Sequence, residues 1–212
     1  LSQNHRPWLA IIVLMLGITL LGIMGGIIKH LGESYSPTFL AVARNIFGFV
    51  PVLMILIITK KTKSIFSLTG KKNTFLLILR GGSIACAQFC FYLALMKLEF
   101  ATASTLVFAG PLFLTALSVP ILGATVGVWR WAAVVIGFFG IVLIMDVGTN
   151  LFNVFALLPL GAAFGYALSS VLVKLFNSEV SSSLIQLYTQ TITLVSAIVL
   201  LLAFSGYTPI LS

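Results

Sequence analysis

Long apolar runs separated by short polar turns make up most of the chain. A membrane-spanning helix needs about 20 mainly apolar residues, and seven runs reach that length. The runs are long and show no strict alternation, so they predict helices rather than strands. The predicted spans cover residues 8–28, 37–59, 74–96, 101–122, 129–147, 153–174 and 183–204. The pattern therefore predicts an all-α membrane protein, a polytopic bundle of transmembrane helices.

The composition indicates that lipid is the main solvent. The chain has 212 residues, of which 60% are hydrophobic and 8% are charged, whereas a soluble domain carries about 25% charged residues. The net charge of +8 does not indicate nucleic-acid binding, because the few basic residues sit mainly at the ends of apolar runs. Cys86 and Cys90 lie four apart in one apolar run, so no disulfide framework is indicated.

Lys and Arg predict the orientation, because cytoplasmic connections carry an excess of them. With a cytoplasmic N-terminus, eight basic residues fall on the cytoplasmic side: Arg6, Lys60, Lys61, Lys63, Lys71, Lys72, Arg130 and Lys174. Only Lys29 and Lys97 fall at outer ends, where Lys29 is expected to reach the lipid headgroups. We therefore predict a multi-pass protein of the inner (cytoplasmic) membrane with its N-terminus in the cytoplasm.

A shift of 145 residues lays "GIIKHLGESYSPTFLAVARNIF" (26–47) over "VLVKLFNSEVSSSLIQLYTQTI" (171–192). Lys29 then meets Lys174 and Ser36 meets Ser181, although the identity is low and chance is the alternative. A five-helix repeat has an odd number of helices, so its second copy would be inverted, as in many secondary transporters. The expected division is a first repeat over 1–147 and the start of a second over 148–212. We expect a fragment, truncated after the seventh helix.

One family shows the same order of features. The stretch from about 31 to 147 resembles the EamA domain of the drug/metabolite transporter superfamily. The resemblance rests on "PTFLAVARNIFGFVPVLMIL", "LRGGSIACAQFCFYLALMKLEFATASTLVFAGPLFLTALSVPILG" and "WRWAAVVIGFFGIVLIM". It implies ten helices in two inverted halves and transport of a small metabolite. One departure is Ala124 after Leu122 and Gly123, where family members often carry a glutamate.

Polar residues form one stripe along the seventh span. Their spacing of i, i+3, i+4 and i+7 places them on one helix face: Gln186, Thr189, Gln190 and Thr193. The 145-residue shift relates this stripe to Ala41, Arg44, Asn45 and Gly48. We therefore predict that Arg44 faces a cavity between the repeats and holds an anionic group of the substrate beside Asn45. The alternative is a structural arginine that reaches the headgroups or pairs with Glu33 or Glu99.

Further polar or special residues lie in other spans. Gln88 and Tyr92 share one face of the third span, where they contact either substrate or a neighbouring helix. Pro111 predicts a helix kink in the fourth span, either lining a cavity or packed. Arg80 is expected to reach the headgroups. The GxxxG pairs Gly22/Gly26 and Gly161/Gly165 predict close helix packing.

Together these features favour a secondary transporter that works by alternating access. The resemblance implies an amino-acid-like or S-adenosylmethionine-like substrate, and Arg44 suits a carboxylate. The alternatives are a passive channel, a non-transporting membrane scaffold and an intramembrane enzyme. The sequence has no cluster of His, Asp and Glu, so we expect no enzyme activity, metal or cofactor. The expected partners are the lipid bilayer and the substrate, not nucleic acid, and a homodimer is compatible with the sequence.

Overall fold

The computed structural model describes residues 7–32, 34–58, 71–145, 154–176 and 182–204. Every element in these ranges is a helix. The helices are α1 (Pro7–Leu31), α2 (Pro37–Ile58), α3 (Lys71–Lys97), α4 (Phe100–Val107), α5 (Gly110–Leu122), α6 (Val128–Ile144), α7 (Leu157–Val173) and α8 (Ser182–Phe204), with a 3-10 turn, η2 (Val154–Ala156), leading into α7.

The helices follow the predicted spans within a few residues, and the all-α polytopic fold class is confirmed. In the described part of the chain, five stretches are long and apolar enough to cross a membrane: Ile11–Leu31, Asn73–Lys97, Phe100–Leu122, Val154–Val173 and Ser182–Ala203. The second and fifth predicted spans contain shorter apolar stretches, Thr38–Met54 and Val128–Ile144. The division of the chain into five-helix repeats stays a prediction.

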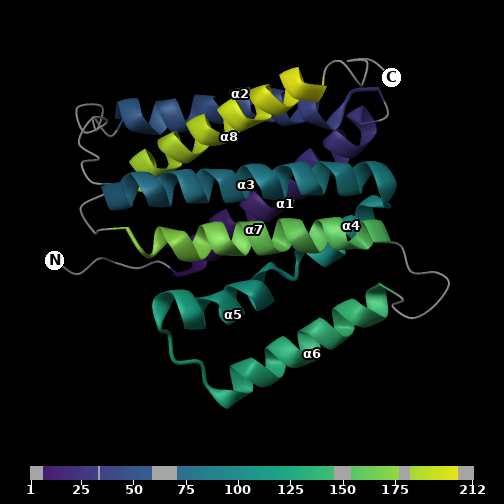
Figure 1. Ribbon diagram of the computed structural model, residues 1–212, viewed down its shortest axis with the longest axis vertical. Helices are drawn as coiled ribbons and strands as arrows, with labels where there is room; N and C mark the ends of the chain where they lie inside the picture. Colours follow the sequence, from purple (N-terminus) through teal and green to yellow (C-terminus); the bar gives the residue numbers. More distant parts are fainter. Residues whose placement is uncertain (1–6, 33, 59–70, 146–153, 177–181, 205–212) are drawn as a thin grey trace.

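Successive spans run in opposite directions, with α4 and α5 together forming one span, so the ends of the spans lie at two ends of the bundle. We call these the Leu98 end, which includes the turn between α3 and α4, and the Gly123 end, which includes the turn between α5 and α6. Figure 1 shows α3 at the centre of the bundle. It packs against α7 and α8, while α8 also packs against α2, and α7 against α5. Helix α6 packs against α5 at one edge.

Close packing between α3 and α7 depends on Gly165. A Cβ atom at this position would lie 2.8 Å from the backbone oxygen of Ser83 and 2.9 Å from Cβ of Ala87. The same atom at Gly161 would meet only Sγ of Cys90, at 4.0 Å, which is an ordinary contact. The prediction of close packing therefore holds at Gly165, where the two backbones approach each other.

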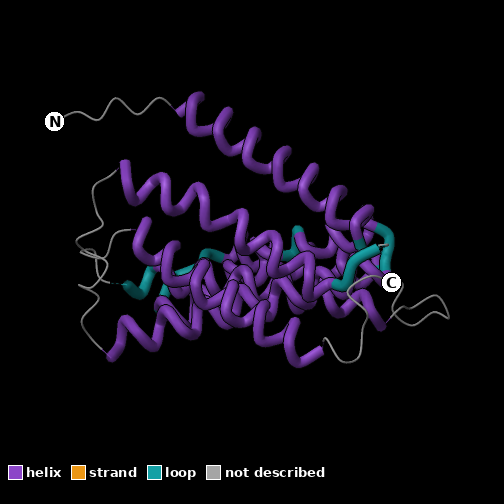
Figure 2. Tube along the Cα trace, turned by 90° about the horizontal axis from the view of Figure 1, so that it is seen from above, coloured by secondary structure: helices purple, strands orange, loops and turns teal. Residues whose placement is uncertain are grey.

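Helix α1 stands apart from the other helices along most of its length and meets them near its Leu31 end (Figure 2). A Cβ atom at Gly22 or Gly26 would meet no described atom within 4 Å, so the prediction that this pair packs closely is wrong. At the Leu31 end, Nζ of Lys29 donates to the backbone oxygens of Leu95 and, at 3.0 Å, Leu98. Lys29 thus caps α3, whose last carbonyls lack helical partners, instead of pointing to the headgroups.

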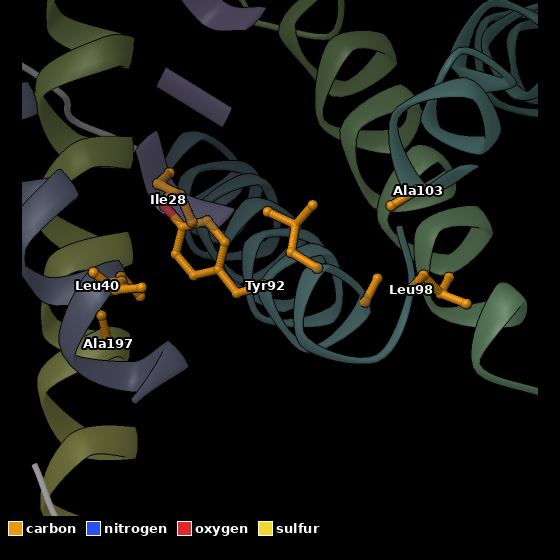
Figure 3. Close-up of a cluster of buried hydrophobic side chains, with 9 residues drawn as sticks. Ile28, Leu40, Tyr92, Leu98, Ala103 and Ala197 are labelled. Atoms are coloured by element: carbon orange, nitrogen blue, oxygen red, sulfur yellow. The ribbon is translucent and has the colours of Figure 1, made fainter. Parts of the chain in front are cut away.

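A buried apolar cluster joins α1, α2, α3, α4 and α8 towards the Leu98 end. Figure 3 shows the Tyr92 ring directed towards Ile28, with Leu40 of α2 and Ala197 of α8 on the same side of α3. Only 1% of the Tyr92 surface is exposed, and burial of such an aromatic ring contributes strongly to packing. The cluster therefore fixes the Tyr92 ring, and with it the position of its hydroxyl group.

The fourth predicted span is interrupted where the sequence places Pro111. Helix α4 ends at Val107 and α5 begins at Gly110, with Pro111 in its first turn. Proline has no backbone N–H, so it cannot continue the hydrogen-bond ladder of α4, whereas the first turn of a helix tolerates it. At the other end of α5, Gly123 has a φ of 63°, a left-handed conformation that glycine adopts without strain.

Candidate functional site

The polar stripe of α8 lies against α2, where Asn45 meets Gln190. The Gln190 Nε2 atom donates to the backbone oxygen of Asn45 at 2.9 Å and to its Oδ1 atom at 3.4 Å. Gly48 leaves room for this contact, because a Cβ there would lie 2.5 Å from Nε2 of Gln190. Asn45 and Gln190 are 145 residues apart, so the two positions matched by the sequence shift touch each other.

Arg44 is partly buried among three helices. Its guanidinium group makes side-chain hydrogen bonds with Tyr92 of α3 and Tyr166 of α7, in which the phenolic oxygens accept. These described partners are hydroxyl groups rather than a carboxylate, and Glu33, one of the suggested partners, lies outside the described residues. Arg44 therefore keeps its positive charge without a bonded counter-charge in the described part of the chain.

Tyr166 is a site residue that the sequence analysis missed. It lies in an apolar run, and the 145-residue shift relates it to Leu21, which is also apolar. Neither a polar stripe nor the internal repeat therefore pointed to it. Its proximity to Arg44 depends on how α7 packs in the bundle, which the one-dimensional pattern does not contain.

Gln88 links α3 to α2 and to Tyr92. Its Nε2 atom lies 3.5 Å from the backbone oxygen of Ala41 and 3.4 Å from the hydroxyl oxygen of Tyr92. Gln88 is buried, so these contacts satisfy an amide that would otherwise be costly to place there. Of the two predicted roles, the contact with a neighbouring helix is present in the structure, and the substrate contact stays a prediction.

Most of the predicted site residues line one open groove of about 770 Å³. The groove runs between α1, α2 and α8 and includes Tyr166 of α7. The predicted residues along it are Arg44, Asn45, Gln88, Gln186, Thr189, Gln190 and Thr193. We call it the polar groove. Asn45 is only 4% exposed and its Nδ2 atom has no partner among the described residues, so this groove contains an unused buried donor.

A second groove of about 550 Å³ meets the first at Arg44 and Tyr166 and includes Tyr92. We call it the aromatic groove, because Phe91, Phe100 and Phe108 line it together with the two tyrosines. The last turn of α4 contributes to this lining, directly before the interruption of the helix. Pro111 itself lines neither groove, so it acts on the site only through the break that it imposes.

Arg80 points into the bundle, and the prediction that it reaches the headgroups is wrong. Its Nη1 atom donates to the Thr189 hydroxyl and lies 3.4 Å from the backbone oxygen of Ile185, both on α8. The Nε atom is buried without a partner in the described part of the chain. The inward direction brings the guanidinium group to oxygen acceptors of α8, one of which belongs to its polar stripe.

The chemical groups of the site are amides, hydroxyls and guanidinium groups. Within the described ranges, no three His, Cys, Asp or Glu side chains come together as metal ligands would. Such groups bind polar or anionic molecules by hydrogen bonds and charge, and none of the described groups around the grooves is a carboxylate.

Known proteins resemble parts of this chain. Residues 8–146, more than half of the chain, match the EamA-like transporter family. A protein named riboflavin transporter, from Vibrio cholerae serotype O1, is 40% identical over 83 residues, which are 39% of this chain and 28% of that relative. The match thus spans less than a third of the relative's length. No solved structure matches the chain.

Proposed function

The chain belongs to the EamA-like transporter family, and on this basis we propose that it acts in a secondary transporter that moves a small metabolite across the cytoplasmic membrane by alternating access. The observation that carries the proposal is the position of Arg44. A guanidinium group bonded to Tyr92 and Tyr166 lies where the polar and aromatic grooves meet. Charged groups within membrane spans are costly, and they commonly mark the path of a substrate.

We further propose that the site lies between two inverted repeats, residues 1–147 and the part that begins at 148. The contact between Asn45 and Gln190 supports this, because symmetry-related positions touch only near the symmetry axis. The direction of the helices is also consistent with inversion, since α2 and α8 cross with opposite chain directions (Figure 1). A substrate site at the repeat interface is the usual arrangement in secondary transporters.

The proposed substrate carries a carboxylate, as amino acids and S-adenosylmethionine do. The fork of a guanidinium group binds a carboxylate with two hydrogen bonds. The unpartnered Nδ2 atom of Asn45 adds a donor in the polar groove, and Gln186, Thr189, Gln190 and Thr193 line its α8 side. This set of groups suits a compact polar substrate.

Riboflavin is a second candidate substrate, which the name of the Vibrio cholerae relative favours. The aromatic groove provides a supporting observation, because flat ring systems stack on the rings of Phe and Tyr. A hydroxylated chain would then extend from Arg44 along the amides and hydroxyls of the polar groove. In this arrangement Arg44 donates to neutral oxygens instead of a carboxylate.

Two other functions are weaker candidates. A passive channel would need a continuous polar lining, whereas the described residues of the aromatic groove are mainly apolar. A scaffold without transport activity would need neither a buried donor without a partner nor a charge without a counter-charge, whereas among the described residues Asn45 has the first and Arg44 the second. For orientation we propose a cytoplasmic N-terminus and a cytoplasmic Gly123 end, from the distribution of Lys and Arg.

An uptake and efflux screen with the full-length protein in proteoliposomes tests the proposal. The panel contains labelled amino acids, S-adenosylmethionine and riboflavin, and protein-free liposomes are the control. Saturable uptake that speeds up when unlabelled substrate is present on the opposite side supports alternating access. Uptake that rises linearly with concentration would indicate a channel, and no uptake or efflux of any compound would favour a scaffold.

A further inference from the structure

Arg80 lies inside a membrane-spanning helix and has only neutral partners among the described residues. Its guanidinium group bonds to the Thr189 hydroxyl and faces the carbonyl of Ile185. The four acidic residues of the chain, Glu33, Glu99, Asp146 and Glu179, all lie outside the ranges of the helices. The charge of Arg80 therefore has no carboxylate beside it within those helices.

Such an arrangement is costly unless something else supplies the negative charge. Removing a cation from water carries a large penalty, and neutral hydrogen-bond acceptors offset it only in part. Arg80 also leaves one donor, Nε, buried without a partner among the described residues. An uncharged donor could make the same hydrogen bonds between α3 and α8. A role in holding these two helices together therefore does not explain why the donor is a guanidinium group.

Thr189 connects Arg80 to the polar groove. Its hydroxyl accepts from Arg80 and donates to the carbonyl of Ile185 at 2.7 Å, while Thr189 itself lines the groove that contains Arg44. Along their helices, Arg80 is roughly 14 Å and Arg44 roughly 21 Å from the Gly123 end, at about 1.5 Å per residue. The two guanidinium groups thus lie at different depths, and Arg80 is nearer to the Gly123 end. Thr189 lies in the polar groove with Arg44 and also contacts Arg80.

We propose that Arg80 is a second anion-binding group of the transport path, on the Gly123 side of Arg44. Thr189 holds its guanidinium group while no anion is present, and the anionic part of the substrate replaces Thr189 as that group moves past. This rests on the proposed transport function and narrows the substrate class to molecules with an acidic group. Two cations in sequence also repel molecules of net positive charge, so among the proposed candidates they disfavour S-adenosylmethionine, whose sulfonium and ammonium groups outnumber its carboxylate.

Chemical modification tests the proposal without a known substrate. Phenylglyoxal reacts with accessible guanidinium groups, and peptide mass spectrometry measures its reaction with each arginine of the full-length protein in proteoliposomes. Inorganic sulfate is the anion probe, compared with chloride at equal ionic strength. Arg130, which is exposed at the start of α6, is the internal reference.

We expect phenylglyoxal to modify Arg80, and sulfate at about ten times its dissociation constant to slow this reaction about tenfold, since only the sulfate-free fraction reacts. Sulfate should still protect Arg80 in Arg44→Gln, because the two groups are separate. Thr189→Val should speed the modification of Arg80, since the hydroxyl no longer holds it.

Three results would overturn the proposal: an unmodified Arg80 under conditions that modify Arg130, a rate that sulfate does not change, or an unchanged rate in Thr189→Val. These results do not depend on the uptake screen. A protein that transports but shows no sulfate protection would retain the proposed function and lose this inference alone. A protein that shows protection without transport would retain Arg80 as an anion-binding group but lose both the proposed function and the place of Arg80 in a transport path.

Discussion

Arg44 and Arg80 carry the same charge but have different surroundings. Arg44 has two phenolic partners that are held by separate helices, α3 and α7, whereas Arg80 bonds to side-chain and backbone oxygens of α8 only. A change in the packing of α3 against α7 therefore acts on Arg44 through its tyrosines. Movement of α8 acts directly on Arg80.

The first prediction concerns the fork of Arg44. In the full-length protein, Arg44→Lys keeps the positive charge but loses one of two parallel hydrogen bonds to a carboxylate. We expect about a tenfold loss of substrate affinity in Arg44→Lys and a larger loss in Arg44→Gln. The measurements are binding and transport of the substrate found in the screen, beside expression level and thermal stability.

Arg130→Lys is the matched control, because Arg130 is exposed and is not among the residues that line either groove. If Arg44→Lys bound the substrate with wild-type affinity, Arg44 would not bind a carboxylate through two parallel hydrogen bonds. Unchanged affinity combined with lost stability in Arg44→Gln would make Arg44 a structural anchor, held by Tyr92 and Tyr166.

For single residues, the sequence predicted which side chains share a helix face better than it predicted which side chains they contact on other helices. The four polar residues of α8 share a face because helix periodicity alone determines it. The contact of Arg44 with Tyr166 and that of Arg80 with Thr189 depend on the distance and rotation between helices. These quantities follow from the packing of many apolar side chains, so neither contact could be derived from the pattern.

At the scale of helices, the contact between α3 and α7 positions both tyrosines that bind Arg44. The helices approach closely because Gly165 has no side chain where it faces Ser83 and Ala87. The break between α4 and α5 was predictable, since Pro111 removes a backbone donor wherever the helix packs. The absence of close packing at Gly22 and Gly26 was not, because a GxxxG pair does not specify which helix, if any, lies against it.

The second prediction compares two glycines of α7. We expect Gly165→Ala to destabilise the protein by about 1–3 kcal/mol, because the added methyl group must push against a backbone oxygen. Gly161→Ala should change the stability by no more than about 0.5 kcal/mol, since its nearest neighbour is Cys90 at 4.0 Å. Thermal unfolding of the purified full-length variants in detergent measures both. Equal effects at the two positions would show that α3 and α7 do not approach at Gly165.

At the scale of the whole molecule, the spans and their approximate limits in the described part of the chain followed from the length of the apolar runs, with α4 and α5 together filling the fourth predicted span. The separation of α1 from the bundle did not, because every apolar run looks equally suited to lipid or to protein. In the structure, α1 forms one side of both grooves while it contacts the rest mainly near Leu31. The two grooves are therefore open because α1, which forms one side of each, is separated from the other helices along most of its length.

The third prediction concerns orientation. The connection at Ser67 is expected in the cytoplasm and the turn at Glu99 outside, from the distribution of Lys and Arg. In variants without Cys86 and Cys90, an impermeant maleimide should label Glu99→Cys in intact cells and Ser67→Cys only after permeabilisation. Labelling of Ser67→Cys but not Glu99→Cys in intact cells would reverse the orientation.

The amide pair at Asn45 and Gln190 has a further consequence. A carboxamide carries one donor nitrogen and one acceptor oxygen, so two of them can be self-complementary and close a ring of two reciprocal bonds. Here Gln190 donates to Asn45, while Nδ2 of Asn45 has no partner in the described part of the chain. If the repeats arose from one ancestral sequence, identical residues at this point could have satisfied each other. With side chains of unequal length, as Asn45 and Gln190 have, one amide donor is left over, and it belongs to a residue of the polar groove.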